Sequence, residues 1–161
     1  MLNETFYIDG IDARSVGIRL QSPIKFSEAK PSYKVQSVLG RNGGILIEDG
    51  YYKNRTGKAE CFVLQRDAEK AISSAGRFLM GKKGYRRLET SDDPDHYWLA
   101  MAKNSPQIEI RKNVLAPFKI DFDCKPQRFL KSGESPIVFT DSGALFNQYG
   151  QDALPVIKIY G

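Results

Sequence analysis

The segment from Gly40 to Arg55, GRNGGILIEDGYYKNR, is the first place in the sequence where a ligand could bind, because it holds four glycines. A glycine-rich loop cradles a phosphate when it ends in Lys followed by Ser or Thr and leads into a helix. Neither dipeptide follows Gly43 and Gly44, and the apolar run Ile45–Ile47 follows instead. The glycines therefore indicate tight β turns, in which they supply positive φ angles, and no cofactor is expected.

His96 is the single histidine, so a serine-histidine-aspartate triad would have to be built on it. It follows the acidic turn Asp92-Asp93-Pro94-Asp95 at the start of an extended segment, which is typical of a partly exposed side chain. The same turn could offer oxygen ligands to calcium, but it lacks the Asp-x-Asp-x-Asp-Gly spacing of a calcium loop. The sequence therefore favours a solvated turn over a catalytic or calcium site.

The remaining reactive groups also favour structural roles. Cys61 and Cys124 lie among apolar neighbours without zinc-ligand spacing, which predicts buried thiols. Asp121 and Asp123 could form a carboxylate pair, but flanking lysines favour a charged outer face. We therefore predict no catalytic residue, no metal ligand and no enzymatic activity.

Composition and charge are those of a globular domain. The chain has 161 residues, 41% hydrophobic and 27% charged, with a net charge of +5. It contains neither a run of about 20 apolar residues nor the basic and then apolar start of a secretory signal. The densest basic stretch, residues 77–87, holds Arg77, Lys82, Lys83, Arg86 and Arg87. It suits nucleic acid or a solvated helix end, and the latter is favoured because the aromatic spacing of a single-strand binding groove is missing.

Strands must position most of these groups. Alternating apolar residues predict extended segments at 6–8, 18–20, 33–38, 58–65, 85–90, 96–103, 106–112 and 116–126. In the last of these, Phe118, Ile120, Phe122 and Cys124 are predicted to point inward. Residues 58–65 are apolar on both faces, which predicts a central strand. The Asn42-Gly43-Gly44 cluster predicts a hairpin, and Asp49-Gly50 predicts a second turn.

One helix is predicted, at about 67–81, with Asp67 as its N-cap. Its apolar residues recur at three- and four-residue steps, so they form one stripe against a sheet: Ala68, Ala71, Ile72, Ala75 and Leu79. Strands, one helix and further strands predict an α+β fold dominated by antiparallel sheet.

After Phe129 the sequence becomes rich in Gly, Ser, Asp and Asn. A lone strand is predicted at Ile137–Thr140, and the alternation of Val156–Tyr160 predicts another. Because strands need partners, the latter either pairs with the main domain or begins a second domain.

Five motifs occur in a distinctive order: FYIDGIDARSVGIRL, GRNGGILIEDGYYKNR, a helix ending in FLMGKKGYRRLE, DDPDHYWLAM and FKIDFDCKPQRF. Together they resemble the N-terminal domain of the distal tail protein (Dit) family of siphovirus tails and related prophages. The matching positions are Gly40, Arg41, Asn42, Gly43, Gly50, Tyr51, Tyr97, Phe122, Cys124 and Pro126. Leu39 departs from the proline common in the family, and His96 and Trp98 flank Tyr97 where a second tyrosine is common. The resemblance covers about residues 5–128.

The resemblance implies a β-sandwich-like domain with one helix and a projecting β-hairpin, similar to phage tail-tube proteins. It implies a structural virion protein, made in the bacterial cytoplasm, that forms a hexameric ring around a channel through which DNA passes without specific binding. The implied partners are the tail tube protein, the tail-associated lysin or tip protein and a receptor-binding protein. Residues 1–128 would form the ring, and residues 129–161 would be a linker and the first strand of a truncated or missing galectin-like domain.

Two hypotheses remain open on the sequence alone. In the first, Arg41, Asn42, Tyr51 and Tyr52 contact the neighbouring subunit, since Tyr and Arg are enriched at interfaces; the two tyrosines could instead pack on their own sheet. In the second, the chain is a soluble β-rich module that binds nucleic acid or protein through residues 77–87.

Overall fold

The computed structural model describes residues 4–64, 68–104, 115–147 and 155–160. The described part is mainly antiparallel β with one α-helix, which confirms the predicted fold class. Its strands are β1 (Phe6–Ile8), β2 (Ile11–Asp12), β3 (Arg19–Leu20), β4 (Lys25–Phe26), β5 (Pro31–Ser37), β6 (Gly44–Tyr52), β7 (Arg55–Leu64), β8 (Arg86–Thr90), β9 (His96–Ala102) and β10 (Leu115–Leu130). Its helices are α1 (Ala68–Met80) and the short 3-10 helices η1 (Ala13–Val16) and η3 (Lys131–Glu134).

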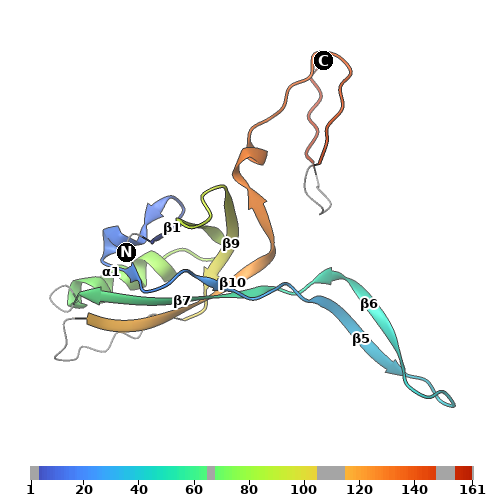
Figure 1. The fold of residues 1–161 in the computed structure, drawn as a ribbon, viewed down its shortest axis with the longest axis horizontal. Helices are drawn as coiled ribbons and strands as arrows, with labels where there is room; N and C mark the ends of the chain where they lie inside the picture. Colours follow the sequence, from blue (N-terminus) through green and yellow to red (C-terminus); the bar gives the residue numbers. More distant parts are fainter. Residues whose placement is uncertain (1–3, 65–67, 105–114, 148–154, 161) are drawn as a thin grey trace.

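The main sheet has eight strands in the order β2-β1-β8-β9-β10-β7-β3, with β4 also paired to β7. Strands β5 and β6 form a separate two-stranded sheet that projects from this body (Figure 1). The long β7–β10 ladder runs from the pair Leu64–Leu115 to the pair Arg55–Cys124. Because β7 has neighbours on both edges, the prediction of a central strand with two apolar faces is confirmed.

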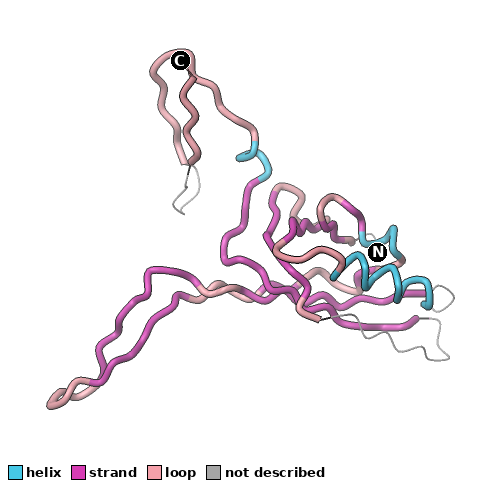
Figure 2. The backbone as a smooth tube through the Cα atoms, turned by 180° about the vertical axis from the view of Figure 1, so that it is seen from behind, coloured by secondary structure: helices cyan, strands magenta, loops and turns pink. Residues whose placement is uncertain are grey.

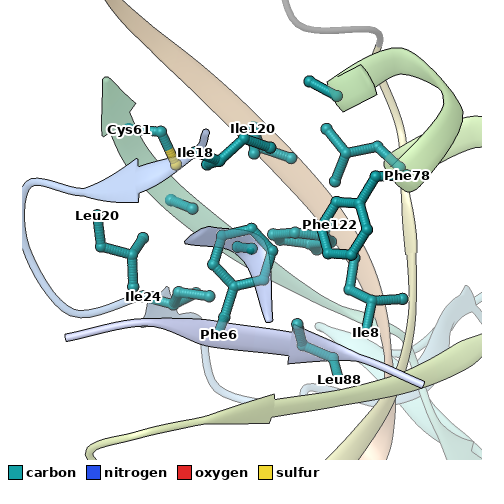
Figure 3. Packing of buried hydrophobic residues seen from close by; sticks show 14 of the residues in the cluster. Phe6, Ile8, Ile18, Leu20, Ile24, Cys61, Phe78, Leu88, Ile120 and Phe122 are labelled. Atoms are coloured by element: carbon teal, nitrogen blue, oxygen red, sulfur yellow. The ribbon is translucent and has the colours of Figure 1, made fainter. Parts of the chain in front are cut away.

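The main sheet curls around its core. Strands β1 and β10 are three positions apart in the strand order, a separation of about 14 Å in a flat sheet. The ring centroids of Phe6 and Phe122, from these two strands, are nevertheless only 5.9 Å apart (Figure 3). Strands β4 and β9 are also three positions apart, through β7 and β10, and the stacked rings of Phe26 and Trp98 from these strands have their centroids 4.2 Å apart. The curl therefore brings the inward side chains of distant strands into one core.

Helix α1 packs on this core with the predicted apolar stripe. Ala71, Ala75 and Leu79 are buried, and the ring of Phe78 lies 6.1 Å from that of Phe6. The helix confirms the predicted element at 67–81. Its predicted N-cap Asp67, and the strand predicted at 106–112, lie outside the described residues.

The first turns follow from local chemistry. Asp9 and Gly10 have φ angles of 51° and 78°, as a tight turn between β1 and β2 requires. Asp12 caps η1 by accepting hydrogen bonds from the Arg14 backbone N–H (2.8 Å) and the Thr5 hydroxyl (2.7 Å). Partial burial raises the pKa of Asp12, but the hydrogen bonds from Arg14 and Thr5 outweigh it and hold the pKa below its ordinary value.

The turn predicted at Asp49-Gly50 is wrong, because both residues lie inside β6. Gly50 has a φ of +73°, and the pairing register shifts between Pro31–Tyr52 and Tyr33–Glu48. An irregular, bulged stretch of this kind bends a strand without ending it. The glycine therefore shapes the hairpin near its root.

The strands predicted at Ile137–Thr140 and Val156–Tyr160 are not formed, since residues 136–147 and 155–160 contain no helix or strand. Within the described residues no strand pairs with them, and an unpaired extended segment gains no ladder hydrogen bonds. This segment leaves the body in a different direction from the hairpin (Figure 2). Glu134, at the end of η3, binds Arg87 of β8 at 2.7 Å.

Candidate functional site

The β5–β6 hairpin is the most distinctive surface of the molecule, because it extends well beyond the body in both views (Figures 1 and 2). Its tip joins Ser37 to Gly44, which pair across the strands. Gly40 and Gly43 have φ angles of +79° and +82° there, a conformation that favours glycine. The predicted hairpin turn at Asn42-Gly43-Gly44 is therefore confirmed, and its glycines serve chain reversal.

Apolar side chains line the hairpin without being covered. Val35 and Leu46 face each other across the strands and are 66% and 56% exposed. Tyr33 lies on the same face, because it is two residues from Val35 along β5. Tyr52 also lies there, because it pairs with Pro31, which is two residues from Tyr33. The exposed large hydrophobic residues of the hairpin are Tyr33, Val35, Val38, Leu39, Ile45, Leu46, Ile47, Tyr51 and Tyr52. A two-stranded sheet is marginally stable alone, so such a surface indicates contact with a partner.

The four predicted interface residues lie on this hairpin but at opposite ends of it. Arg41 and Asn42 are in the tip, whereas Tyr51 and Tyr52 are at the root, about 20 Å away along the strands. Tyr51 and Tyr52 are exposed in the single chain and are not part of the hydrophobic core. Whether all four touch a neighbour stays a prediction.

Sequence reasoning missed the residues between these ends, above all Val35 and Leu46. Tyr33 and Val35 alternate as a strand facing a core would. Without the topology, nothing distinguishes a strand that faces its own core from one that faces a partner. The glycine-rich turn signals at Asn42-Gly43-Gly44 and Asp49-Gly50 were the available indication that this pair of strands stands apart.

A polar cluster ties the root of the hairpin to the body. Asn54, between β6 and β7, donates to the Tyr85 hydroxyl (2.6 Å) and to Asp123 (2.8 Å), and the Tyr85 hydroxyl donates to Asp123 (2.7 Å). The hydrogen bond to Asp123 raises the pKa of Tyr85, since ionisation would break it. These three residues, here called the root clamp, come from three separate parts of the chain and fix the direction of the hairpin.

Replacing Tyr85 with phenylalanine is expected to broaden the range of hairpin directions, because two of the three hydrogen bonds in the root clamp are lost. The stability loss should be about 1 kcal/mol or less, as for exposed hydrogen bonds. Spin labels at Asn42→Cys and Lys119→Cys would report the distance distribution between tip and body. The matched variant Tyr33→Phe leaves the clamp intact and should give the unchanged distribution; equal distributions in all three proteins would contradict the role of the clamp.

The basic stretch at 77–87 does not form one cationic patch. Arg86 is buried and donates to Asp9 (2.9 Å) and to the Phe78 carbonyl oxygen (2.6 Å). Lys82 lies 3.5 Å from the same Asp9 carboxylate, and Arg87 binds Glu134. Partial burial raises the pKa of Asp9, but the hydrogen bond and charge of Arg86, the Arg87 backbone N–H and the charge of Lys82 together outweigh it and hold the pKa below its ordinary value. Three of the five cations therefore serve the fold, and no observation favours a nucleic-acid site there.

Replacing Arg86 with methionine is expected to destabilise the protein by about 2–3 kcal/mol, because buried charge-assisted hydrogen bonds are lost. The exposed neighbour Lys83→Met is the control and should change stability by no more than about 0.5 kcal/mol. Chemical denaturation measures both.

The pH dependence separates loss of the Asp9–Arg86 pair from loss of packing. Since the Asp9 pKa is lowered in the folded protein, the pair stabilises the fold above the unfolded-state pKa and loses this contribution as pH falls through the folded-state pKa. The difference between wild type and Arg86→Met should therefore shrink in acid. A pH-independent difference would point to packing alone.

The other candidate groups have structural partners. His96 Nδ1 lies 2.7 Å from Asp93, whose other carboxylate oxygen binds Arg128 at 3.0 Å, so the acidic turn is joined to β10. Cys61 and Cys124 are buried, and burial raises the pKa of each thiol to about 12. Among the described residues, no three His, Cys, Asp or Glu side chains gather as a metal site. None of the described helices has the length and apolarity needed to cross a membrane.

No protein-family model matches the sequence, and no curated protein matches it. Among solved structures, the chain is similar to the Dit protein (gp 19.1) of phage SPP1, described as a paradigm of the hub adsorption apparatus in phages that infect Gram-positive hosts. The TM-score is 0.58 at 15% sequence identity, covering 79% of this chain and 52% of that chain. The chain therefore spans about half the length of that protein. At this identity the likeness shows the fold, and the chain has a Dit-like fold.

Proposed function

We propose that this chain is a structural protein of a phage tail, in which copies of the curled sheet form a ring at the distal end of the tail tube. The observation that carries the proposal is the projecting β5–β6 hairpin, whose apolar residues are uncovered in the single chain. The Dit-like fold supports it, because the similar protein of SPP1 is described as part of an adsorption hub.

In a closed ring the hairpin of each copy would meet the body of the next. A surface that reaches away from its own body contacts a different surface on the next copy, and such heterologous contacts close into rings when the rotation permits. The hairpin would supply one of the two surfaces, with Val35 and Leu46 near its centre and Arg41, Asn42, Tyr51 and Tyr52 at its ends. We propose six copies, as the family resemblance implies.

In this role the ring joins the tail tube protein on one side to the host-adsorption apparatus on the other. That apparatus comprises the tail-associated lysin or tip protein and a receptor-binding protein. DNA passes through the central channel without specific contacts, and the protein is located in the virion. Residues 1–128 would form the ring subunit, and residues 129–161 would be a linker and the first strand of a galectin-like domain, a strand that has no partner within the described residues.

The proposal is tested by the mass and shape of the assembled protein. Light scattering of concentrated protein should give about six times the 18.1 kDa chain mass, and negative-stain images should show rings with a central hole. A chain that stays monomeric in light scattering at high concentration and shows no rings in the images would contradict the proposal.

A further inference from the structure

A cleft opens on the body between the end of helix α1 and strands β8 and β9. After the helix the chain turns at Gly84, whose φ is +90°, and joins the sheet at Arg86, opposite Ala100. Strand β9 continues to Ala102, so within the described residues its last part has β10 on one side and no strand on the other. The cleft occupies the space left there and has a volume of about 440 Å³.

The cleft has an apolar floor, and two partly exposed methionines line it. Leu79, Leu88 and Phe122 form part of the floor and are themselves buried. Met80, at the end of α1, and Met101, in β9, also line the cleft and are 46% and 39% exposed. Methionine is unbranched and adapts to the shape of a partner, which is why it is common on surfaces that bind varied peptides. This arrangement suits one large apolar side chain from outside.

The charged residues that line the cleft are all cationic, and the nearby Asp9 pairs with two of them, Lys82 and Arg86. The lining includes Lys82, Lys83, Arg86 and Lys103 and contains no Asp or Glu. The dipole of helix α1 accounts for lysines just beyond its C-terminus, but it does not account for Lys103, which comes from the end of β9. Arg86 and Lys82 are already paired with Asp9, whereas Lys83 and Lys103 are exposed. Cations from two separate elements therefore converge above an apolar floor, which favours an acidic ligand.

The free edge of β9 adds a backbone site. The Lys103 N–H donates to the Asp121 carbonyl oxygen of β10 at 2.7 Å. Because successive residues of an antiparallel strand direct their backbone groups to opposite edges, the N–H and C=O of Ala102 are directed to the edge that lines the cleft. An extended segment in the cleft can pair with them, as in β-strand addition.

We propose that this cleft binds an extended acidic peptide segment of a partner protein, with one large apolar side chain as its anchor. The anchor packs against Met80 and Met101 above the floor, and the flanking carboxylates lie beside Lys83 and Lys103. Small-molecule sites hold their ligand with fixed polar groups, whereas flexible lysines suit the variable carboxylates of a peptide. The binding is separate from ring assembly and does not depend on it.

The test uses the full chain and a fluorescein-labelled peptide, Asp-Glu-Asp-Leu-Asp-Glu-Asp, at low salt. Methyl-¹³C methionine labelling gives a local readout, because two of the three methionines line the cleft and Met1 serves as reference. Peptide binding is expected to shift the Met80 and Met101 methyl signals and to weaken as salt screens the carboxylates. Unmoved signals at both methionines would overturn the proposal.

Charge variants distinguish peptide binding at the cleft from non-specific attraction of an acidic peptide to a basic protein. Lys83→Glu with Lys103→Glu is expected to weaken peptide binding by about tenfold or more. The control, Lys25→Glu with Lys30→Glu, makes the same charge change at exposed lysines that do not line the cleft. It should weaken peptide binding by less than about threefold. Equal losses in both variants, or equal binding of a peptide with Ser in place of Leu, would overturn the proposal.

Discussion

Replacing Val35 and Leu46 with aspartate is expected to abolish assembly of the chain into a ring while the body of each subunit stays folded. The two side chains face each other on the hairpin and are exposed in the single chain, so the fold of the body does not need them. In a ring they would be buried, and two desolvated carboxylates would cost at least about 4 kcal/mol per interface. That loss is a factor of about 10³ in affinity, and light scattering should then give the monomer mass.

The matched control for this variant is Gln36→Asp with Ile45→Asp. These residues also face each other across the strands, but on the opposite face of the same hairpin. The control carries the same cross-strand repulsion between carboxylates, and it retains the ring if the neighbour covers the face of Val35 and Leu46 and leaves the face of Ile45 open. Rings in the first variant, or monomers in both, would contradict the assignment of the interface to the face of Val35 and Leu46.

Replacing Phe122 with alanine is expected to destabilise the protein by about 3–5 kcal/mol, the usual cost of removing a buried aromatic ring. Phe122 is 1% exposed and lies against Phe6 across the curl of the sheet. Because domains of this kind are stable by only about 5–15 kcal/mol, the variant should unfold at a much lower denaturant concentration. Urea unfolding followed by circular dichroism measures the difference.

Phe146→Ala provides the control, since Phe146 is 88% exposed in the segment beyond the sheet. It should change the free energy of unfolding by no more than about 0.5 kcal/mol. Combining Phe122→Ala with Phe6→Ala should give less than the sum of the single effects, because the two rings share a contact. A loss of less than about 1 kcal/mol for Phe122→Ala would contradict the curled core.

Where one side of a strand faces a core, the sequence was sufficient to predict which side chains are buried. Phe118, Ile120, Phe122 and Cys124 are all buried along β10, as their alternation predicted. The period of two in apolar residues is a direct consequence of how a strand presents its side chains. The capping of η1 by Asp12 was equally predictable, since its partners lie within a few residues.

Where the outcome depends on distant partners, sequence reasoning failed or gave a partial answer. The turn predicted at Asp49-Gly50 is a bulge, because β5 continues to pair beyond it. The strand predicted at Ile137–Thr140 is absent, because within the described residues no edge pairs with it. In each case the local pattern was real, but hydrogen bonds to another segment decide between strand, turn and irregular chain.

The sequence by itself determined the elements of this protein: the strand periodicities, the amphipathic helix and the glycines that reverse the chain at Asn42-Gly43-Gly44. Only the tertiary structure decided which of their side chains remain exposed and free to contact a partner. It placed Arg86 against Asp9, 77 residues away in sequence, and thereby divided the basic stretch. It also left Val35 and Leu46 uncovered. The burial of a strand depends on which segment packs against it, and the side-chain pattern of the strand itself does not identify that segment.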